Sequence, residues 1–310
     1  MTRLTVVIAA LGTIASPALA AQQVPDTAFA PQVGIPAYES GTGPVVLIDE
    51  AHFNFHTAGG RYLTFARLLQ QDGYVVRPGT ETFAAASLAK ARVLVIANAL
   101  PNAGPWVLPT QPAFTDDEIR AVEAWVRDGG SLFLIADHMP IAGAAESLAR
   151  AFGIEFMNGF AFPGGNTNPP DLFRLTDGTL SRNPVTQGRS AAERIDSVAT
   201  FTGQAFRATR PVVPVLTLDS ASVVLLPIRA WVFNDSTPQV GGAGLLQGAL
   251  LRHGRGRVAV FGEAAMFSAQ RAGAARNPMG MNHPRASRNA QLTLNILHWL
   301  TGLLEPDRGS

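Results

Sequence analysis

Short, unbroken apolar runs alternate along this chain with segments in which apolar residues recur every three or four positions. A run without polar alternation predicts a strand buried on both faces, as in the interior of a parallel sheet. The three- and four-residue spacing predicts helices with one face in the core. Thr115, followed by three acids, marks the start of one helix. Expected buried strands cover residues 44–49, 74–76, 92–97, 131–136 and 257–263. Expected helices cover residues 61–71, 115–128, 144–152 and 287–303.

The order of these elements predicts the fold class. Strand and helix alternate repeatedly from residue 44 to residue 152, which favours a doubly wound α/β fold with a mostly parallel sheet. Residues 160–248 break this pattern with Gly- and Pro-rich turns and short apolar pieces, and they predict an inserted β-rich lobe. The expected division is an extended segment at 21–43, an α/β domain at 44–303 and a tail at 304–310.

The amino terminus has the pattern of a secretory signal peptide. Arg3 provides a positive start, an apolar run follows at 4–15, and Ala18-Leu19-Ala20 has the small residues of a cleavage site. This run, like the later one at 222–233, is too short to cross about 30 Å of hydrocarbon. We therefore expect removal of residues 1–20, no membrane insertion of the mature chain, and a secreted, periplasmic protein.

The charge balance and the absence of cysteine limit the partners that the protein can bind and the reactions that it can catalyse. The 310 residues include 24 Lys and Arg against 23 Asp and Glu, a net charge of +1, which leaves no basic field to hold nucleic acid. The sequence has no cysteine, which excludes disulfides, thiolate metal sites and cysteine nucleophiles. No dinucleotide motif or P-loop follows a strand, and an exported protein has no supply of ATP or NAD(P)H, so we expect no nucleotide cofactor.

Polar residues gather where the expected strands end. In an open parallel sheet, ligands bind at the carboxyl ends of the strands, so these positions are candidates for a site. The residues in question are Asp49, Glu50, His52, Asn54, His56, Asn98, Asp137, His138 and Glu263. Carboxylate and imidazole groups from separate strands suit a divalent ion such as Zn²⁺, Mn²⁺ or Mg²⁺. Such an ion would lower the pKa of a bound water and generate a hydroxide nucleophile.

The roles that we expect of these residues are those of a hydrolase. The expected catalytic residues are Asp137, His138 and Glu263. The expected metal ligands are Asp49, His52, Asp137 and His138. The expected substrate-binding residues are Asn54, Asn98 and His283, the last carried on a loop at 279–284.

Other interpretations remain open at this point. Strand-end Asp, Asn and His residues also cap helices and bridge loops without any chemistry. Ser268 could act as a nucleophile with His138 or His283, and Asp137 with Glu263 could form the carboxylate pair of a glycosidase. A non-catalytic carbohydrate- or envelope-binding protein would use the same polar groups to recognise hydroxyls. A broad aromatic platform beside the acids would favour that alternative.

Several motifs give the chain a family resemblance. The segment Gly129-Gly130-Ser131-Leu132-Phe133-Leu134-Ile135-Ala136-Asp137-His138 follows a helix that ends Trp125-Val126-Arg127-Asp128. It resembles the class I glutamine amidotransferase-like superfamily, and more narrowly its DUF4350-type and trehalose-utilisation (ThuA)-like branches. The other matching pieces are the opening strand with Asp49 and His52, Asn183-Pro184-Val185-Thr186-Gln187-Gly188, Gly262-Glu263 and Asn295-Ile296-Leu297-His298-Trp299-Leu300. The resemblance covers residues 44–152 and 255–303.

The resemblance implies a flavodoxin-like, three-layer core with a site near Asp137 and His138. In the amidotransferases a cysteine nucleophile sits at the strand end that aligns with about Asp137. Because this chain has no cysteine, it is not a cysteine glutamine amidotransferase. Cysteine-less relatives are thought to bind sugars or to act as non-catalytic modules. We therefore expect an exported hydrolase with a small-molecule or glycan substrate, or a non-catalytic binding protein of the same fold.

Overall fold

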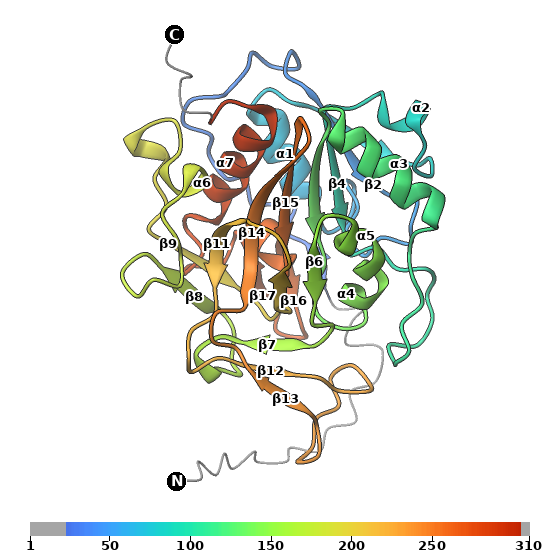
Figure 1. Cartoon of the computed structure of the whole chain (residues 1–310). Coiled ribbons are helices and arrows are strands. Elements are labelled where there is room, and N and C mark those ends of the chain that lie inside the picture. The colour runs from blue at the N-terminus through green and yellow to red at the C-terminus, as the bar shows by residue number, and fades with distance from the viewer. Residues whose placement is uncertain (1–22, 305–310) are drawn as a thin grey trace.

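The computed structural model describes residues 23–304 of the chain (Figure 1). The expected signal peptide at 1–20 lies outside the described residues, and so does the expected tail apart from its first residue. The described part forms a central sheet with helices on both sides and smaller sheets at its margins (Figure 1). None of its helices is long and apolar enough to cross a membrane.

The central sheet has nine strands in the order β3-β2-β4-β5-β15-β14-β10-β6, with β11 also paired to β14. The parallel strands are β3 (Val75–Gly79), β2 (Val45–Asp49), β4 (Val93–Ala97), β5 (Ser131–Ile135) and β15 (Gly256–Phe261). Every residue of β4, β5 and β15 is buried, as the unbroken apolar runs predicted. The chain therefore has the mostly parallel α/β sheet that the sequence predicted.

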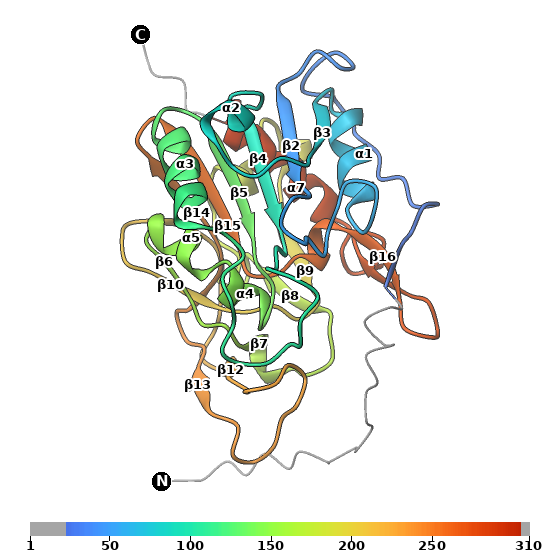
Figure 2. The same ribbon diagram turned by 90° about the vertical axis from the view of Figure 1, so that its right-hand side faces the viewer.

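Two layers of helices enclose this sheet (Figure 2). The helices on one face are α1 (Leu63–Gln71) and α7 (Asn289–Thr301). The helices on the other face are α2 (Ala85–Leu88), α3 (Asp116–Arg127), α4 (Ile141–Ala144) and α5 (Glu146–Ala151). Side chains of β4 divide between the layers, because Val93 and Val95 share a core with α1 whereas Leu94 and Ile96 share a core with α3. The helix expected at 144–152 corresponds to α5, and α4 is a separate short helix that precedes it.

Residues 160–248 contain many short strands, and some of these strands join the central sheet. The antiparallel strands of the central sheet are β6 (Ile154–Phe156), β10 (Phe206–Ala208), β11 (Val213–Thr217) and β14 (Leu246–His253). The reason lies in β14, whose first six residues are buried and which returns directly into β15 through a two-residue turn. Gly254 (φ +58°) is required in this turn, because a Cβ there would lie 2.4 Å from the carbonyl oxygen of Arg127.

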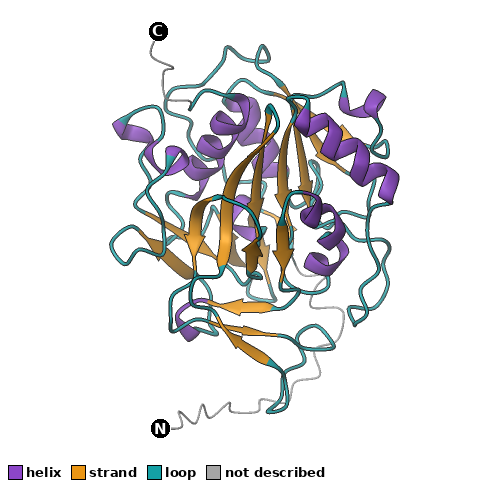
Figure 3. Ribbon diagram, viewed as in Figure 1, coloured by secondary structure: helices purple, strands orange, loops and turns teal. Residues whose placement is uncertain are grey.

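The remaining strands form small antiparallel sheets at the margins of the central one (Figure 3). One contains β13 (Gln239–Gly241), β12 (Val223–Leu225) and β7 (Phe160–Phe162). Another pairs β8 (Asp171–Arg174) with β9 (Ser197–Thr200). The third contains β1 (Val24–Pro25), β16 (Ala269–Ala272) and β17 (Asn277–Gly280). The short helical elements are η2 (Pro163–Gly165), α6 (Pro184–Gln187), η3 (Ala191–Glu193) and η4 (Ala265–Phe267).

Candidate functional site

Neighbouring parallel strands carry polar residues to one edge of the sheet. The strand-end residues are Asp49 on β2, Asn98 after β4, Asp137 and His138 after β5, and Glu263 after β15. The four strands are adjacent in the sheet, so their carboxyl ends lie side by side. Each of these five residues is at most 8% exposed, and buried polar groups need partners. Their hydrogen bonds therefore indicate which of them support the fold and which remain open for chemistry.

His52 joins two acids from distant parts of the chain. Its Nδ1 lies 2.9 Å from Oδ1 of Asp49, and its Nε2 lies 2.7 Å from Oε1 of Glu118 in α3. Asn54 donates from Nδ2 to Oδ2 of Asp49 at 2.8 Å. Burial alone lowers the pKa of His52, but the hydrogen bonds and charges of Asp49 and Glu118 outweigh it and raise the pKa above its usual value. Both imidazole nitrogens are thus committed to linking the loop after β2 with α3.

Glu118 also completes the start of α3. Its Oε2 accepts hydrogen bonds from the backbone N and the hydroxyl of Thr115 at 3.0 and 2.8 Å, and Thr115 Oγ1 accepts from the backbone N of Glu118. Its Oε1 also accepts from the backbone N of Phe83 at 3.2 Å. Burial raises the pKa of Glu118, but the hydrogen bonds from Thr115, His52 and Phe83 together lower it to about 2. Thr115 is the N-cap that the sequence predicted.

Acid should destabilise the protein partly through Glu118. Because its folded pKa of about 2 lies below the usual 4.5, the carboxylate stabilises the folded state above pH 4.5, and this contribution is lost as the pH falls towards 2. Between about pH 5 and about pH 3, we expect the free energy of unfolding to fall less in Glu118→Gln than in the unmodified protein. Urea denaturation at both pH values measures this, with the exposed Glu155→Gln as control. An unchanged pH dependence in Glu118→Gln would contradict the role of Glu118.

Asn98 and the end of β5 hold Asp137 in place. Oδ1 of Asn98 accepts a hydrogen bond from the backbone N of Asp137 at 3.0 Å, and Oδ1 of Asp137 accepts from the backbone N of His138 at 2.8 Å. Asn98 adopts a left-handed backbone conformation (φ +53°), which asparagine tolerates better than most residues. Burial raises the pKa of Asp137, although the charge of His138 and the local hydrogen bonds oppose it. Asp137 therefore holds a proton more tightly than an exposed aspartate does.

Glu263 lies inside the protein, with no exposed surface. Its two oxygens accept hydrogen bonds from the backbone N of Ala265 and of Met266 at 2.7 and 2.8 Å, so it holds the turn into η4. Burial and the charge of Asp137 raise the pKa of Glu263 well above its usual value. Glu263 is therefore placed to influence the charge on Asp137 rather than to meet a ligand directly.

His138 differs from His52, because only one of its ring nitrogens has a hydrogen-bond partner among the described residues. Its Nδ1 lies 2.9 Å from the carbonyl oxygen of Met139, and because a carbonyl only accepts, Nδ1 carries the hydrogen of the neutral ring. Nε2 then has a lone pair, to which no residue within 23–304 donates a hydrogen bond. The ring stacks on Phe160 at 4.4 Å between centroids and meets Trp231 at 4.7 Å. Such an imidazole is suited to accept a proton from a ligand or from water.

The residues that the sequence suggested as metal ligands form two separate pairs. Asp49 and His52 hydrogen-bond to each other, and both nitrogens of His52 are occupied. Asp137 and His138 are neighbours in the chain, and Nδ1 of His138 is occupied. Within the described range, 23–304, no group of three or more His, Cys, Asp or Glu side chains is placed to hold a metal ion. The metal-ligand roles of these four residues therefore stay a prediction.

The residues expected to bind substrate are held by other parts of the fold. Asn54 donates to Asp49, and Asn98 accepts from the backbone of the Asp137 segment, so both orient the strand ends. His283 belongs to a different cluster, in which its ring packs 5.5 Å from that of Phe201. Its Nδ1 accepts a hydrogen bond from the backbone N of Arg285 at 3.1 Å. These contacts give Asn54 and Asn98 a positioning role.

Ser268 is not paired with a histidine. Its side chain is fully buried, and its hydroxyl donates to the carbonyl oxygen of Ala265 at 2.8 Å. The hydroxyl oxygen in turn accepts a hydrogen bond from Nε2 of Gln270 at 2.8 Å. These bonds occupy the hydroxyl within the turn after η4, so the serine nucleophile that the sequence left open is not assembled.

Two features of the site were not apparent from the sequence. The first is the group of aromatic side chains around His138. It consists of Phe160, Trp231 and Trp106, whose ring centroid lies 5.9 Å from that of His138. The second is the burial of His56 without a partner, because this residue is 2% exposed and has no hydrogen-bond partner on either ring nitrogen among the described residues. Burial, with a smaller contribution from the charge of Arg61, lowers the pKa of His56 to about 3 and keeps the ring neutral. Neither feature has a local sequence signal.

The comparisons with known proteins identify relatives of the fold alone. No family model and no curated protein matches the chain. Among solved structures, one titled "mmIFT52 N-terminal domain" is similar with a TM-score of 0.58 and 16% identity, over 86% of this chain and 100% of that one. A ThuA-like protein from Bacteroides uniformis has a TM-score of 0.48 and 16% identity, over 87% of this chain and 94% of its own. The structural neighbours thus include a ThuA-like protein, and the first similarity shows a shared α/β fold.

Proposed function

We propose that the protein is an exported hydrolase whose reaction takes place at the end of β5. The observation that carries this proposal is the 2.9 Å hydrogen bond between Nδ1 of His138 and the carbonyl oxygen of Met139, which leaves Nε2 as a proton acceptor. The adjacent Asp137 has a pKa raised by burial and is suited to hold a proton. A base and an acid side by side are the groups that hydrolysis of an ester, amide or phosphoester requires.

In the proposed reaction, a water beside His138 loses a proton to Nε2 while its oxygen bonds to the carbonyl carbon or phosphorus of the substrate. The bond to the leaving group then breaks, and the leaving group takes a proton from Asp137. Transfer of the proton from the imidazolium to the aspartate restores both residues. The buried surroundings strengthen these interactions, because charges are poorly screened there.

We also propose a finer family assignment and a location. The fold would be the flavodoxin-like core of the glutamine amidotransferase-like superfamily, in a ThuA-like or DUF4350-type branch without the nucleophilic cysteine. Asp137 after β5 supports this assignment, because it occupies the strand end with which that cysteine is expected to align. The motif at residues 1–20 supports export to the periplasm.

A second candidate function is non-catalytic carbohydrate binding. It is favoured by the aromatic side chains around His138, since Phe160 stacks on the imidazole and Trp231 is 52% exposed beside it. Exposed indole faces cover apolar ligand surfaces, and the neighbouring polar groups give orientation. Both candidates place the ligand on the same surface, and they differ in whether a bond is broken.

Assays with residues 21–310 distinguish the two candidates. We expect turnover of at least one class among chromogenic esters, amides, phosphoesters and glycosides.

Trp231→Ala should then raise KM about fivefold with little change in kcat, because it removes about 1 kcal/mol of aromatic contact. Ile228→Ala, an exposed apolar residue in the same loop, is the control. Glycan binding without turnover would replace the hydrolase with the second candidate, and neither binding nor turnover would contradict both.

A further inference from the structure

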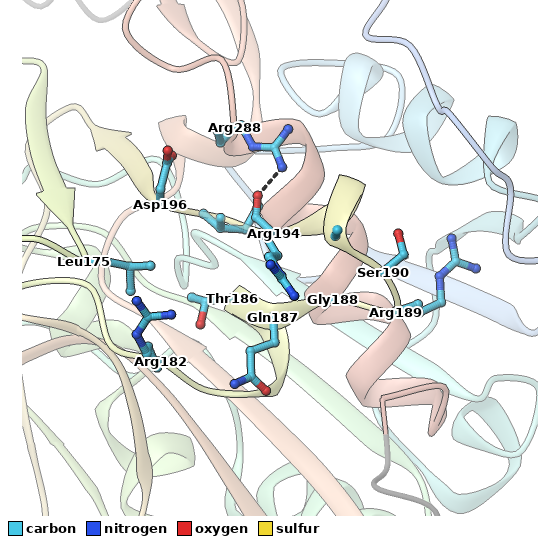
Figure 4. Close-up of a pocket in the computed structure, with 12 residues that line it drawn as sticks. Leu175, Arg182, Thr186, Gln187, Gly188, Arg189, Ser190, Arg194, Asp196 and Arg288 are labelled. Carbon is cyan, nitrogen blue, oxygen red and sulfur yellow. Dashed lines mark hydrogen bonds between the residues drawn. The ribbon is translucent and has the colours of Figure 1, made fainter.

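A cavity of about 1000 Å³ lies apart from the strand-end site (Figure 4). Its walls come from the residue after β8, from Arg182 just before α6, from α6 and the segment that follows it, and from Arg288 just before α7. None of Asp49, Asp137, His138 and Glu263 lines it. A volume of this size is at the upper end of those that hold small organic ligands, about 300–1000 Å³.

The lining of this cavity is strongly positive. Four arginines line it, namely Arg182, Arg189, Arg194 and Arg288, and the one acid in the lining is Asp196. In Figure 4 the carboxylate of Asp196 is directed away from the guanidinium groups of Arg182 and Arg194. The whole chain has a net charge of only +1, so this local excess of cations is not a property of the surface at large. A concave surface of one sign concentrates ligands of the opposite sign.

Two of these arginines are already engaged. Arg189 pairs with Glu193 through Nε at 2.8 Å and Nη2 at 2.5 Å, and Figure 4 shows its side chain directed away from the other arginines. Arg288 donates from Nη2 to the carbonyl oxygens of Ala192 and Arg194, which fixes it at the rim. These bonds position the backbone that carries Arg194.

The other two arginines, Arg182 and Arg194, are not engaged in this way by the described residues. Neither guanidinium has a hydrogen bond or an ion pair with any residue in the described part of the chain. Figure 4 shows them approaching the space in front of Thr186 from opposite sides. Guanidinium groups in this arrangement can each form a two-point contact with a carboxylate or phosphate group.

The walls of the cavity are held by buried amides. Oδ1 of Asn183 accepts from the backbone N of Val185 and of Thr186 at 3.0 and 3.1 Å and so caps α6. Nδ2 of Asn295, fully buried in α7, donates to the carbonyl oxygens of Val185 and Glu193 at 2.7 and 2.9 Å. The backbone around Arg182 and Arg194 is therefore fixed before a ligand arrives, which lowers the entropic cost of binding.

We propose that this cavity binds a small organic polyanion, with Arg182 and Arg194 as its anchors and Arg288 as a third cation. Two separated guanidinium groups favour a ligand with at least two carboxylate or phosphate groups over a single inorganic ion. The volume also leaves space for the carbon skeleton that connects these groups. The proposed site is independent of the hydrolase proposal, because it shares no residue with the end of β5.

Calorimetric titration of residues 21–310 with citrate and with inorganic pyrophosphate tests the proposal at low ionic strength. We expect a Kd below about 1 mM for at least one probe and weaker binding as salt is added. Arg182→Gln and Arg194→Gln should each raise this Kd about 10- to 100-fold. Binding of citrate alone would identify carboxylates as the recognised groups, and binding of pyrophosphate alone would identify phosphates.

The matched control is Arg207→Gln, which removes an exposed arginine on β10 outside the cavity. Its Kd should stay within about twofold of the unmodified value. All three variants should keep their melting temperature, since the three arginines are exposed and the guanidinium groups of Arg182 and Arg194 have no hydrogen bond or ion pair with the described residues. Absence of binding by the unmodified protein, or equal weakening by all three substitutions, would overturn the proposal. Either result leaves the hydrolase proposal untouched.

Discussion

Replacing His52 by Leu should lower the free energy of unfolding by about 3–5 kcal/mol. The substitution removes the partner at 2.9 Å from Asp49, a residue with no exposed surface, and the partner at 2.7 Å from Glu118. Asp49 keeps its hydrogen bonds from Asn54 and from the backbone N of Ala51 but loses the imidazole that offsets its burial. Burial lowers the pKa of His52, but these two acids outweigh it and raise the pKa above its usual value, so a pH of about 6 favours the charged imidazole. Urea denaturation at that pH measures the change.

The control for this prediction is Lys90→Gln. Lys90 pairs with Glu81 through side chains that are both more than half exposed, so its removal should change stability by at most about 1 kcal/mol. If His52→Leu does not fold, His52→Asn replaces it and should still lose more stability than Lys90→Gln. A loss in the His52 variants no larger than that of the control would contradict a stabilising network around His52.

The same segment connects His52 to the end of β5. The carbonyl oxygen of His52 accepts from the backbone N of Leu100 at 2.9 Å, and the backbone N of Phe55 donates to the carbonyl oxygen of Asn98 at 2.9 Å. Asn98 in turn accepts from the backbone N of Asp137. The loop after β2 is therefore tied to α3 on one side and to the strand ends on the other. Substitutions at His52 should thus disturb the geometry of the candidate site together with stability.

The sequence predicted those parts of the fold that depend on local pattern. The run at 131–136 indicated a strand buried on both faces, and β5 is such a strand. Thr115 and the acids after it indicated where α3 begins, and the capping bonds with Glu118 are formed. In both cases the physical cause, apolar burial or an unsatisfied helix terminus, acts within a few residues. Such causes leave a local trace in the sequence.

The sequence did not predict contacts between distant residues. His52 and Glu118 are separated by 66 positions, and nothing in either segment indicates that one imidazole bridges two acids. Likewise, β14 enters the central sheet because of its pairing with β15 and β11, whereas its own residues resemble those of any apolar strand. The aromatic side chains around His138 belong to Trp106, Phe160 and Trp231, which come together only in the folded chain. Such contacts between distant residues decide which polar side chains are free to bind a ligand or to transfer a proton.

Replacing His138 by Gln should lower kcat about 10²- to 10⁴-fold with a substrate identified among the chromogenic compounds. Gln retains a polar side chain of similar reach, but its amide does not accept a proton at neutral pH. KM should change little, since Phe160 and Trp231 still line the surface and the lost interaction belongs to the transition state. Steady-state kinetics at constant pH measure both constants.

A structural role of His138 would produce a different result. In His138→Ala, added imidazole should restore part of kcat if the ring serves as a base, whereas it would not restore activity lost through misfolding. The control is His253→Gln, because His253 is the last residue of β14, at the opposite end of β15 from Glu263, and pairs with Glu123 at 2.6 Å. This variant should retain the kcat of the unmodified protein. A His138→Gln enzyme with unchanged kcat would place the base elsewhere. The next imidazole to substitute would then be His56, whose ring nitrogens have no hydrogen-bond partner among the described residues.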